Sequence, residues 1–205
     1  MQSDEILALA RAVLNTESAS VAALVNQLDE TFVTVAYTLL KCQGHVLVAG
    51  SGTSNPVAAR LAHLLSCCGT PALFIHPGDS QHGLSGAVTD RDVLILISKG
   101  GETAEVNRLA EIARQRGATL IAFTENPAST LAKLCHHVLR IQAIPEADPF
   151  GMIATGSSLT VCAMADALCV SMLRLRGYTK EAFGQTHPGG AVGIKLTHQG
   201  KAEGV

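Results

Sequence analysis

Short apolar runs recur along the chain and alternate with stretches of helical periodicity. Each run has four or five residues, mostly Val, Ile, Leu and Ala, with little alternation of apolar and polar residues within the run. Continuous apolar runs of this length are typical of strands that are covered on both faces, as in a parallel sheet. The pattern therefore predicts five parallel strands, at residues 46–49, 72–75, 93–97, 120–123 and 138–141.

Helical periodicity fills the gaps between these runs. Asn55 and Pro56 suit the N-cap and first position of one helix, which can end at Gly69. Another helix is expected to begin near Thr103 and to stop at Gly117. Because strands alternate with helices, the chain is expected to form an α/β fold in which helices flank a five-stranded parallel sheet.

Two longer helices are expected outside this alternation. Residues 18–40 carry a helical stripe of apolar side chains, and residues 156–176 are apolar nearly all round. A helix that is apolar on every side is buried, so the second is expected under the sheet or at a subunit interface. We expect a single domain, with a helical segment over 1–43, an α/β core over 44–196 and a polar, frayed tail over 197–205.

Composition narrows the classes of function. The 205 residues are 47% apolar and only 3% aromatic, and the formal net charge is −2. A nucleic-acid binder usually has a basic excess and stacking aromatics, so we expect no nucleic acid as partner. No apolar run reaches the roughly 18 residues of a membrane span, and the acidic start does not resemble a signal peptide. The chain is expected to be cytoplasmic, not bound to a membrane, with its six cysteines reduced.

Two polar loops follow the first and third predicted strands, and each leads into a helix. In an open parallel sheet, ligands bind where strands end, and backbone N–H groups at helix N-termini attract anions. The loops predict a phosphate site, although tight turns with ordinary hydroxyl caps would show the same residues. The candidate phosphate-binding residues are Ser51, Gly52, Thr53 and Ser54 in the first loop and Ser98, Lys99, Gly100 and Thr103 in the second.

The same loops carry a family resemblance. The segments 52–54 (GTS) and 98–103 (SKGGET) resemble the sugar isomerase (SIS) domain family, whose second loop typically reads S-x-S-G-E-[ST]. The segments 76–83 (HPGDSQHG) and 186–193 (THPGGAVG) are similar to motifs of its arabinose-5-phosphate isomerase branch. The resemblance runs from about residue 44 to 196. It implies a doubly wound, flavodoxin-like three-layer sandwich and an aldose–ketose interconversion of a sugar phosphate.

The resemblance also implies roles for individual residues. Glu102, His82 and His187 match polar positions of the branch's active site, and Thr155 and Ser157 fall in a segment that lines its pocket. Isomerisation needs groups that open the sugar ring and a base that removes the proton beside the carbonyl, through an enediol. We expect Glu102 to be that base and the two histidines to open the ring or shuttle protons. The alternatives without a catalytic role are helix capping by Glu102, a surface position for His82 and a turn-shaping role for His187.

Several positions depart from the branch's usual pattern. The branch has Lys where this chain has Thr53, Glu where it has Ala128, and Asp where it has Leu84, while Gly100 replaces a common Ser. Lys99 brings a positive charge into the second loop, and we expect it to replace part of the missing one. Many relatives carry CBS regulatory modules after this domain, and we expect no such regulation within this chain.

Two function classes remain open from the sequence. One is a sugar-phosphate isomerase, with arabinose 5-phosphate and ribulose 5-phosphate as the leading pair or another sugar phosphate in their place. The other is a binding module that senses a phosphosugar without turning it over. No metal and no cofactor is required by the isomerase scheme. The resemblance further implies a homo-oligomer, a dimer of dimers, whose active sites are completed across a subunit interface.

Overall fold

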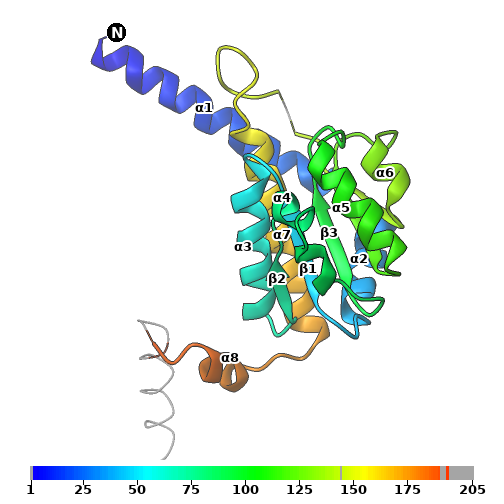
Figure 1. Cartoon of the computed structure of the whole chain (residues 1–205). Coiled ribbons are helices and arrows are strands. Elements are labelled where there is room, and N and C mark those ends of the chain that lie inside the picture. Colours follow the sequence, from blue (N-terminus) through cyan, green and yellow to red (C-terminus); the bar gives the residue numbers. More distant parts are fainter. Residues whose placement is uncertain (1, 144, 190–192, 194–205) are drawn as a thin grey trace, which may run out of the picture.

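A single parallel sheet organises the chain. The computed structural model describes residues 2–143, 145–189 and 193 (Figure 1). The strands are β1 (Val46–Gly50), β2 (Ala72–Phe74), β3 (Val93–Ile97), β4 (Thr119–Thr124) and β5 (His137–Arg140). They lie in the order β2-β1-β3-β4-β5, and every neighbouring pair is parallel. The predicted five-stranded α/β fold is confirmed, with strand ends that differ by at most one residue from the apolar runs.

Helices cover both faces of this sheet. The helices are α1 (Ser3–Ala23), α2 (Glu30–Leu40), α3 (Ser54–Cys67), α4 (Pro77–Ser80), α5 (Ala104–Gln115), α6 (Thr130–Leu134), α7 (Gly156–Leu175) and α8 (Lys180–Thr186), with 3-10 turns η1 (Leu24–Gln27) and η2 (Leu84–Ala87). One hydrophobic core lies between α2, α3 and α7 and one face of the sheet. The other lies between α5, α6 and the opposite face. Alternate residues of β3 divide between the two: Ile95 and Ile97 face the first core, and Leu94 and Leu96 the second. This division explains why the strands are apolar without interruption.

The strand order places a switch point between β1 and β3. From β1 the chain crosses to β2 on one side of the sheet and then returns to β3 on the other. The connections after β1 and β3 therefore leave the same edge in opposite directions, which opens a crevice at their carboxyl ends. The two loops singled out by the sequence are the two that flank this crevice.

The predicted helix over 18–40 is wrong, because the chain breaks there into two helices. α1 ends at Ala23, η1 follows, and α2 begins after Asp29. The Asp29 carboxylate accepts a hydrogen bond of 2.8 Å from the backbone N–H of Thr31. An aspartate that caps a helix start in extended conformation competes with continued helix, and here the cap prevails over the apolar periodicity. α1 extends away from the body of the molecule (Figure 1).

The start of α3 also differs from the prediction. The N-cap is Thr53, so Asn55 lies inside the first turn and Pro56 is the third helical residue. Gly52 has a φ of +57°, and the N–H of Ser54 already donates to the Ser51 carbonyl at 3.1 Å. Since this glycine turn closes early, the helix begins earlier than the Asn-Pro pair indicates.

Helix α7 is apolar, but only one side of it is buried. It packs against α1, α2 and α3 and places Met164, Leu168 and Met172 in the core. Leu159 and Val170 on its other side are exposed. Within the described part of the chain, α7 is the one helix whose length and mean hydropathy, 1.5, would permit a membrane crossing. The six cysteines are free thiols; two are buried and four are partly covered.

Candidate active site

A pocket opens at the carboxyl ends of the strands, on the side of the sheet covered by α3 and α7. Its polar wall comes from the start of α3, the ends of β3 and β4, and the first turn of α7. Its floor is apolar and belongs to the core. The lining residues are Thr53, Ser54, Val57, Ile97, Lys99, Phe123, Thr124, Glu125, Ile141, Ala154, Ser157, Ser158 and Val161.

Two long helices point their N-termini at this pocket. Thr53 and Ser54 stand at the start of α3, and Ser157 and Ser158 in the first turn of α7. The N–H groups at a helix start carry partial positive charge, which favours an anion. At α7 the backbone N–H of Ser157 already donates to Glu146 Oε2 at 3.2 Å, whereas the start of α3 has no carboxylate partner among the described contacts. The hydroxyl groups add hydrogen-bond donors. The polar wall therefore offers hydrogen-bond donors to a phosphate and to hydroxyl groups of a ligand, above an apolar floor.

The loop after β3 is held by its own side chains. The hydroxyls of Ser98 and Thr103 share a hydrogen bond of 2.8 Å, and the N–H of Gly101 donates to Ser98 Oγ at 3.1 Å. Ser98 is buried by this arrangement. Ser98 and Thr103 thus shape the loop from inside, and Lys99 is the residue of this loop that lines the pocket.

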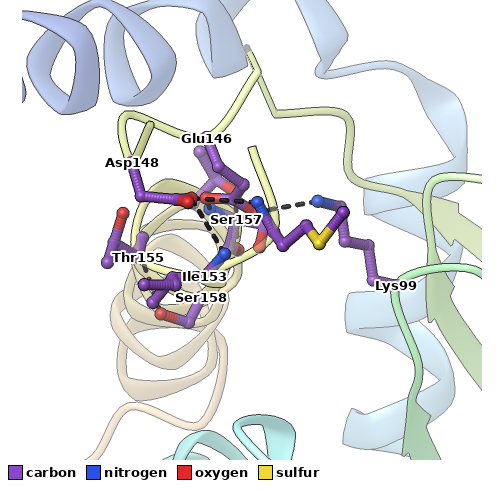
Figure 2. Close-up of polar contacts among 9 residues, drawn as sticks. Lys99, Glu146, Asp148, Ile153, Thr155, Ser157 and Ser158 are labelled. Atoms are coloured by element: carbon purple, nitrogen blue, oxygen red, sulfur yellow. Dashed lines mark hydrogen bonds and ion pairs between the residues drawn. The ribbon is translucent and has the colours of Figure 1, made fainter. Parts of the chain in front are cut away.

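The Lys99 side chain reaches a carboxylate on a distant loop. Lys99 Nζ lies 2.8 Å from Glu146 Oε1, in the segment between β5 and α7. Figure 2 shows the two side chains directed toward one another beside the first turn of α7. Burial raises the pKa of the Glu146 carboxyl, but hydrogen bonds from Lys99 and Ser157 outweigh it and hold the pKa below its usual range.

Four of the sequence-predicted ligand residues line the pocket: Thr53, Ser54, Lys99 and Ser157. The others lie beside it. Ser51 and Gly52 form the turn before α3, and the side chains of Ser98 and Thr103 are hydrogen-bonded to each other. Gly100 is exposed, and Thr155 is the N-cap of α7. Their role as ligands stays a prediction.

Glu102 is directed toward α6 and is not among the lining residues. Its Oε1 accepts a hydrogen bond of 2.9 Å from the backbone N–H of Thr130, the first residue of α6. This hydrogen bond holds the pKa of the exposed Glu102 carboxyl below its usual range. The capping role that the sequence left open is thus present, although at the neighbouring helix α6 and not at α5.

The two histidines lie apart from the pocket. His82 is exposed in the turn after α4, and His187 follows α8. His187 Nε2 lies 3.3 Å from Sγ of Cys67, the last residue of α3, and its ring stacks on Phe183. Ser54, the first residue of the same helix, lines the pocket. A helix of 14 residues is about 20 Å long, so His187 is about that far from the pocket of its own chain.

Comparison with known proteins gives the family. A family profile for the SIS domain matches residues 39–171, which is more than half of the chain. The chain belongs to the SIS domain family. The arabinose 5-phosphate isomerase KdsD of Yersinia pestis is 37% identical over 184 residues, 90% of this chain and 56% of the relative. The chain therefore spans little more than half of the length of that relative.

Solved SIS structures have the same architecture. A Listeria monocytogenes protein is 37% identical, with a TM-score of 0.90 over 92% of this chain and 100% of the other. The E. coli CFT073 protein c3406, solved in complex with arabinose 5-phosphate, is 32% identical, with a TM-score of 0.88 over the same shares of the two chains. The predicted family resemblance is confirmed.

Two carboxylates near the SIS pocket were missed by the sequence analysis. Glu125 lines the pocket and follows β4 directly, so the rule that placed the loops after β1 and β3 would have found it. Glu146 had no comparable signal, because it lies in a long connection without secondary structure. The catalytic assignments of Glu102, His82 and His187 rest on the family resemblance and remain predictions.

Proposed function

We propose that the protein is a sugar-phosphate aldose–ketose isomerase that works through an enediol. The observation that carries this proposal is the pocket at the switch point, with Lys99, five hydroxyl side chains and two helix N-termini in its polar wall. That wall suits a phosphate and sugar hydroxyls, and the adjacent Glu125 adds a carboxylate. Membership of the SIS family and the similarity to KdsD support the reaction class.

Arabinose 5-phosphate and ribulose 5-phosphate are the proposed pair. The similarity to KdsD isomerases and to the structure solved with arabinose 5-phosphate supports this pair. In the proposed reaction, a base removes the C2 proton of the open aldose, a donor polarises the carbonyl, and the proton returns to C1. We propose Glu102 as the base, with His82 and His187 opening the ring or moving protons.

The reaction itself is the first test. In deuterated water, incubation with arabinose 5-phosphate is expected to give ribulose 5-phosphate with deuterium incorporated at C1 of the ketose. A matched panel of pentose and hexose phosphates, with the unphosphorylated sugars as controls, identifies the substrate by proton NMR. Saturable binding across the panel without exchange or ketose formation would refute the isomerase and favour a phosphosugar-binding module.

We also propose a cytoplasmic dimer of dimers, built from a single SIS domain over 1–205, whose sites are shared between subunits. The position of His187 supports shared sites, because its ring lies about 20 Å from the pocket of its own chain. A second subunit can bring its own His187 to this pocket in a symmetric assembly. The exposed apolar side of α7, with Leu159 and Val170, suits burial between subunits.

Shared sites predict that two inactive variants restore each other. Glu102→Gln and His187→Ala proteins, co-expressed with different tags, are expected to form mixed dimers in which one of two sites keeps both residues. Random pairing then recovers roughly a quarter of the wild-type activity. The control mixes the two separately purified proteins without subunit exchange. Activity no higher than that of the parents, in purified mixed oligomers, would show that each site uses one chain only.

A further inference from the structure

A cysteine thiol lies between two imidazole rings at the C-terminal end of α3. Cys67 is the last residue of this helix, and its Sγ atom lies 3.6 Å from Nε2 of His63, about one turn earlier on the same helix. Nε2 of His187, which follows α8, lies 3.3 Å from the same sulfur. Cys67 is half-buried and His63 is exposed, so the group lies at the surface. We call these three residues the thiol–imidazole cluster.

The ring of His187 is oriented so that its Nε2 faces the thiol as a base. Its Nδ1 lies 3.0 Å from the Phe183 carbonyl oxygen, and a carbonyl oxygen can only accept a hydrogen bond. Nδ1 therefore carries the proton of the neutral ring, and Nε2 presents its lone pair to Cys67 Sγ. The ring also stacks on Phe183, with centroids 3.8 Å apart and an interplanar angle of 10°. The thiol proton thus has an acceptor that is held in place.

Four other cysteines are in a different environment. Burial raises the pKa of the Cys135 and Cys169 thiols to about 12, and it also raises the pKa of the Cys68 and Cys162 thiols. The thiolate is the nucleophilic form of cysteine, so a raised pKa leaves these four sulfurs unreactive near neutral pH.

Cys42 shows that partial exposure is not what distinguishes Cys67. Both residues are half-buried. The Cys42 thiol donates to the carbonyl oxygen of Arg91 at 3.5 Å, and a carbonyl oxygen does not take up the proton. The imidazole contacts therefore set Cys67 apart from a cysteine of similar exposure.

We propose that Cys67 is a nucleophilic thiol that exchanges with low-molecular-weight disulfides, with His187 as the base that takes its proton. The thiolate attacks one sulfur of the disulfide, a bond forms to Cys67 Sγ, and the disulfide S–S bond breaks. The leaving thiolate receives the proton from His187 Nε2, so one mixed disulfide and one free thiol result. Among the described residues, no group of three or more His, Cys, Asp or Glu is arranged to hold a metal ion, which favours thiol exchange over metal binding.

Mass spectrometry of the intact protein with glutathione disulfide tests this assignment. At neutral pH the first glutathione is expected to add at Cys67, about tenfold faster than at Cys42, because a neighbouring imidazole raises the thiolate fraction. Peptide fragmentation separates Cys67 from Cys68, and excess dithiothreitol should restore the original mass. Absence of addition at Cys67, or addition at Cys42 or Cys68 that is as fast, would overturn the proposal.

Three variants separate the base from simple exposure. Cys67→Ser should abolish the fast addition and leave the rate at Cys42 within about twofold of wild type, since the two sites are independent. His187→Gln keeps a polar side chain, but an amide cannot take the proton, so the rate at Cys67 is expected to fall about tenfold. His63→Gln should lower it less, because His63 is exposed and its contact is longer. An unchanged rate in His187→Gln that unfolds in urea like wild type, or a larger effect of His63→Gln, would overturn the role given to His187.

The adduct has a consequence for turnover, and this consequence alone rests on the proposed function. Glutathione on Cys67 Sγ displaces the His187 ring from the sulfur, so kcat of the modified protein is expected to fall about tenfold or more. Labelling needs no turnover, so its failure would refute the thiol assignment and leave the isomerase intact. Full activity of protein labelled at Cys67 would instead refute the catalytic role proposed for His187, and the thiol assignment would stand on the labelling rates.

Discussion

Replacing Glu102 with Gln is expected to lower kcat for isomerisation by about 100-fold or more, with KM within about threefold of wild type. General acid–base catalysis contributes on this scale, and an amide cannot accept the proton. The amide oxygen of Gln still accepts the Thr130 N–H that Glu102 Oε1 accepts at 2.9 Å, so the start of α6 is preserved. The change therefore removes the base and keeps the contact. Steady-state kinetics at saturating sugar phosphate measures it.

The matched control for this change is Glu105→Gln. Glu105 also carries a carboxylate, one turn later at the start of α5, and it does not line the pocket. The kcat of the Glu105→Gln variant is expected to stay within about twofold of the wild-type value. An unchanged kcat for Glu102→Gln would assign Glu102 to capping α6 alone, and Glu125, the carboxylate in the pocket wall, would become the candidate base.

Replacing Gly101 with Ala is expected to destabilise the protein by about 2–5 kcal/mol. Gly101 has a φ of +71°, a conformation that costs other residues about 1–2 kcal/mol. A Cβ atom there would also overlap the side chain of Ser129, which is buried and caps α6. Overpacking of this kind costs about 1–3 kcal/mol more. Because Gly101 lies two residues after Lys99, sugar-phosphate affinity should fall as well.

The neighbouring glycine is the control for Gly101. Gly100 has no positive φ, and a Cβ atom built on it meets nothing within 4 Å. The free energy of unfolding of Gly100→Ala, measured by urea titration, is therefore expected to lie within about 0.5 kcal/mol of the wild-type value. If Gly101→Ala unfolded at the same urea concentration as Gly100→Ala, the close packing of this loop on α6 would be refuted.

The lysine that lines the pocket comes from the loop after β3. Where the isomerase branch has a lysine, this chain has Thr53, at the N-cap of α3. Lys99 enters the same pocket from the β3 loop, on the other side of the switch point. Since β1 and β3 are neighbouring strands, a side chain from either loop can reach the ligand. The position of Lys99 is thus compatible with the prediction that it replaces part of the missing positive charge at Thr53.

The sequence by itself determined the sheet and one edge of the site. Apolar runs without alternation indicate strands buried on both faces, and this signal lies within a few residues of each strand. The polar loops after β1 and β3 follow from the same reading, since the carboxyl ends of parallel strands share an edge. Three of the predicted ligand residues, Thr53, Ser54 and Lys99, line the pocket for this reason, whereas the fourth, Ser157, came from the family resemblance.

Tertiary structure alone decided which charges meet. Lys99 and Glu146 are 47 residues apart in the sequence. Their contact depends on where the connection between β5 and α7, which has no periodic pattern, folds back onto α7. The direction of Glu102 toward α6, and the distance of His187 from its own pocket, likewise follow from how separate elements pack. Periodicity and capping are local properties of the chain, whereas pairing between loops is set by the packed core that positions them.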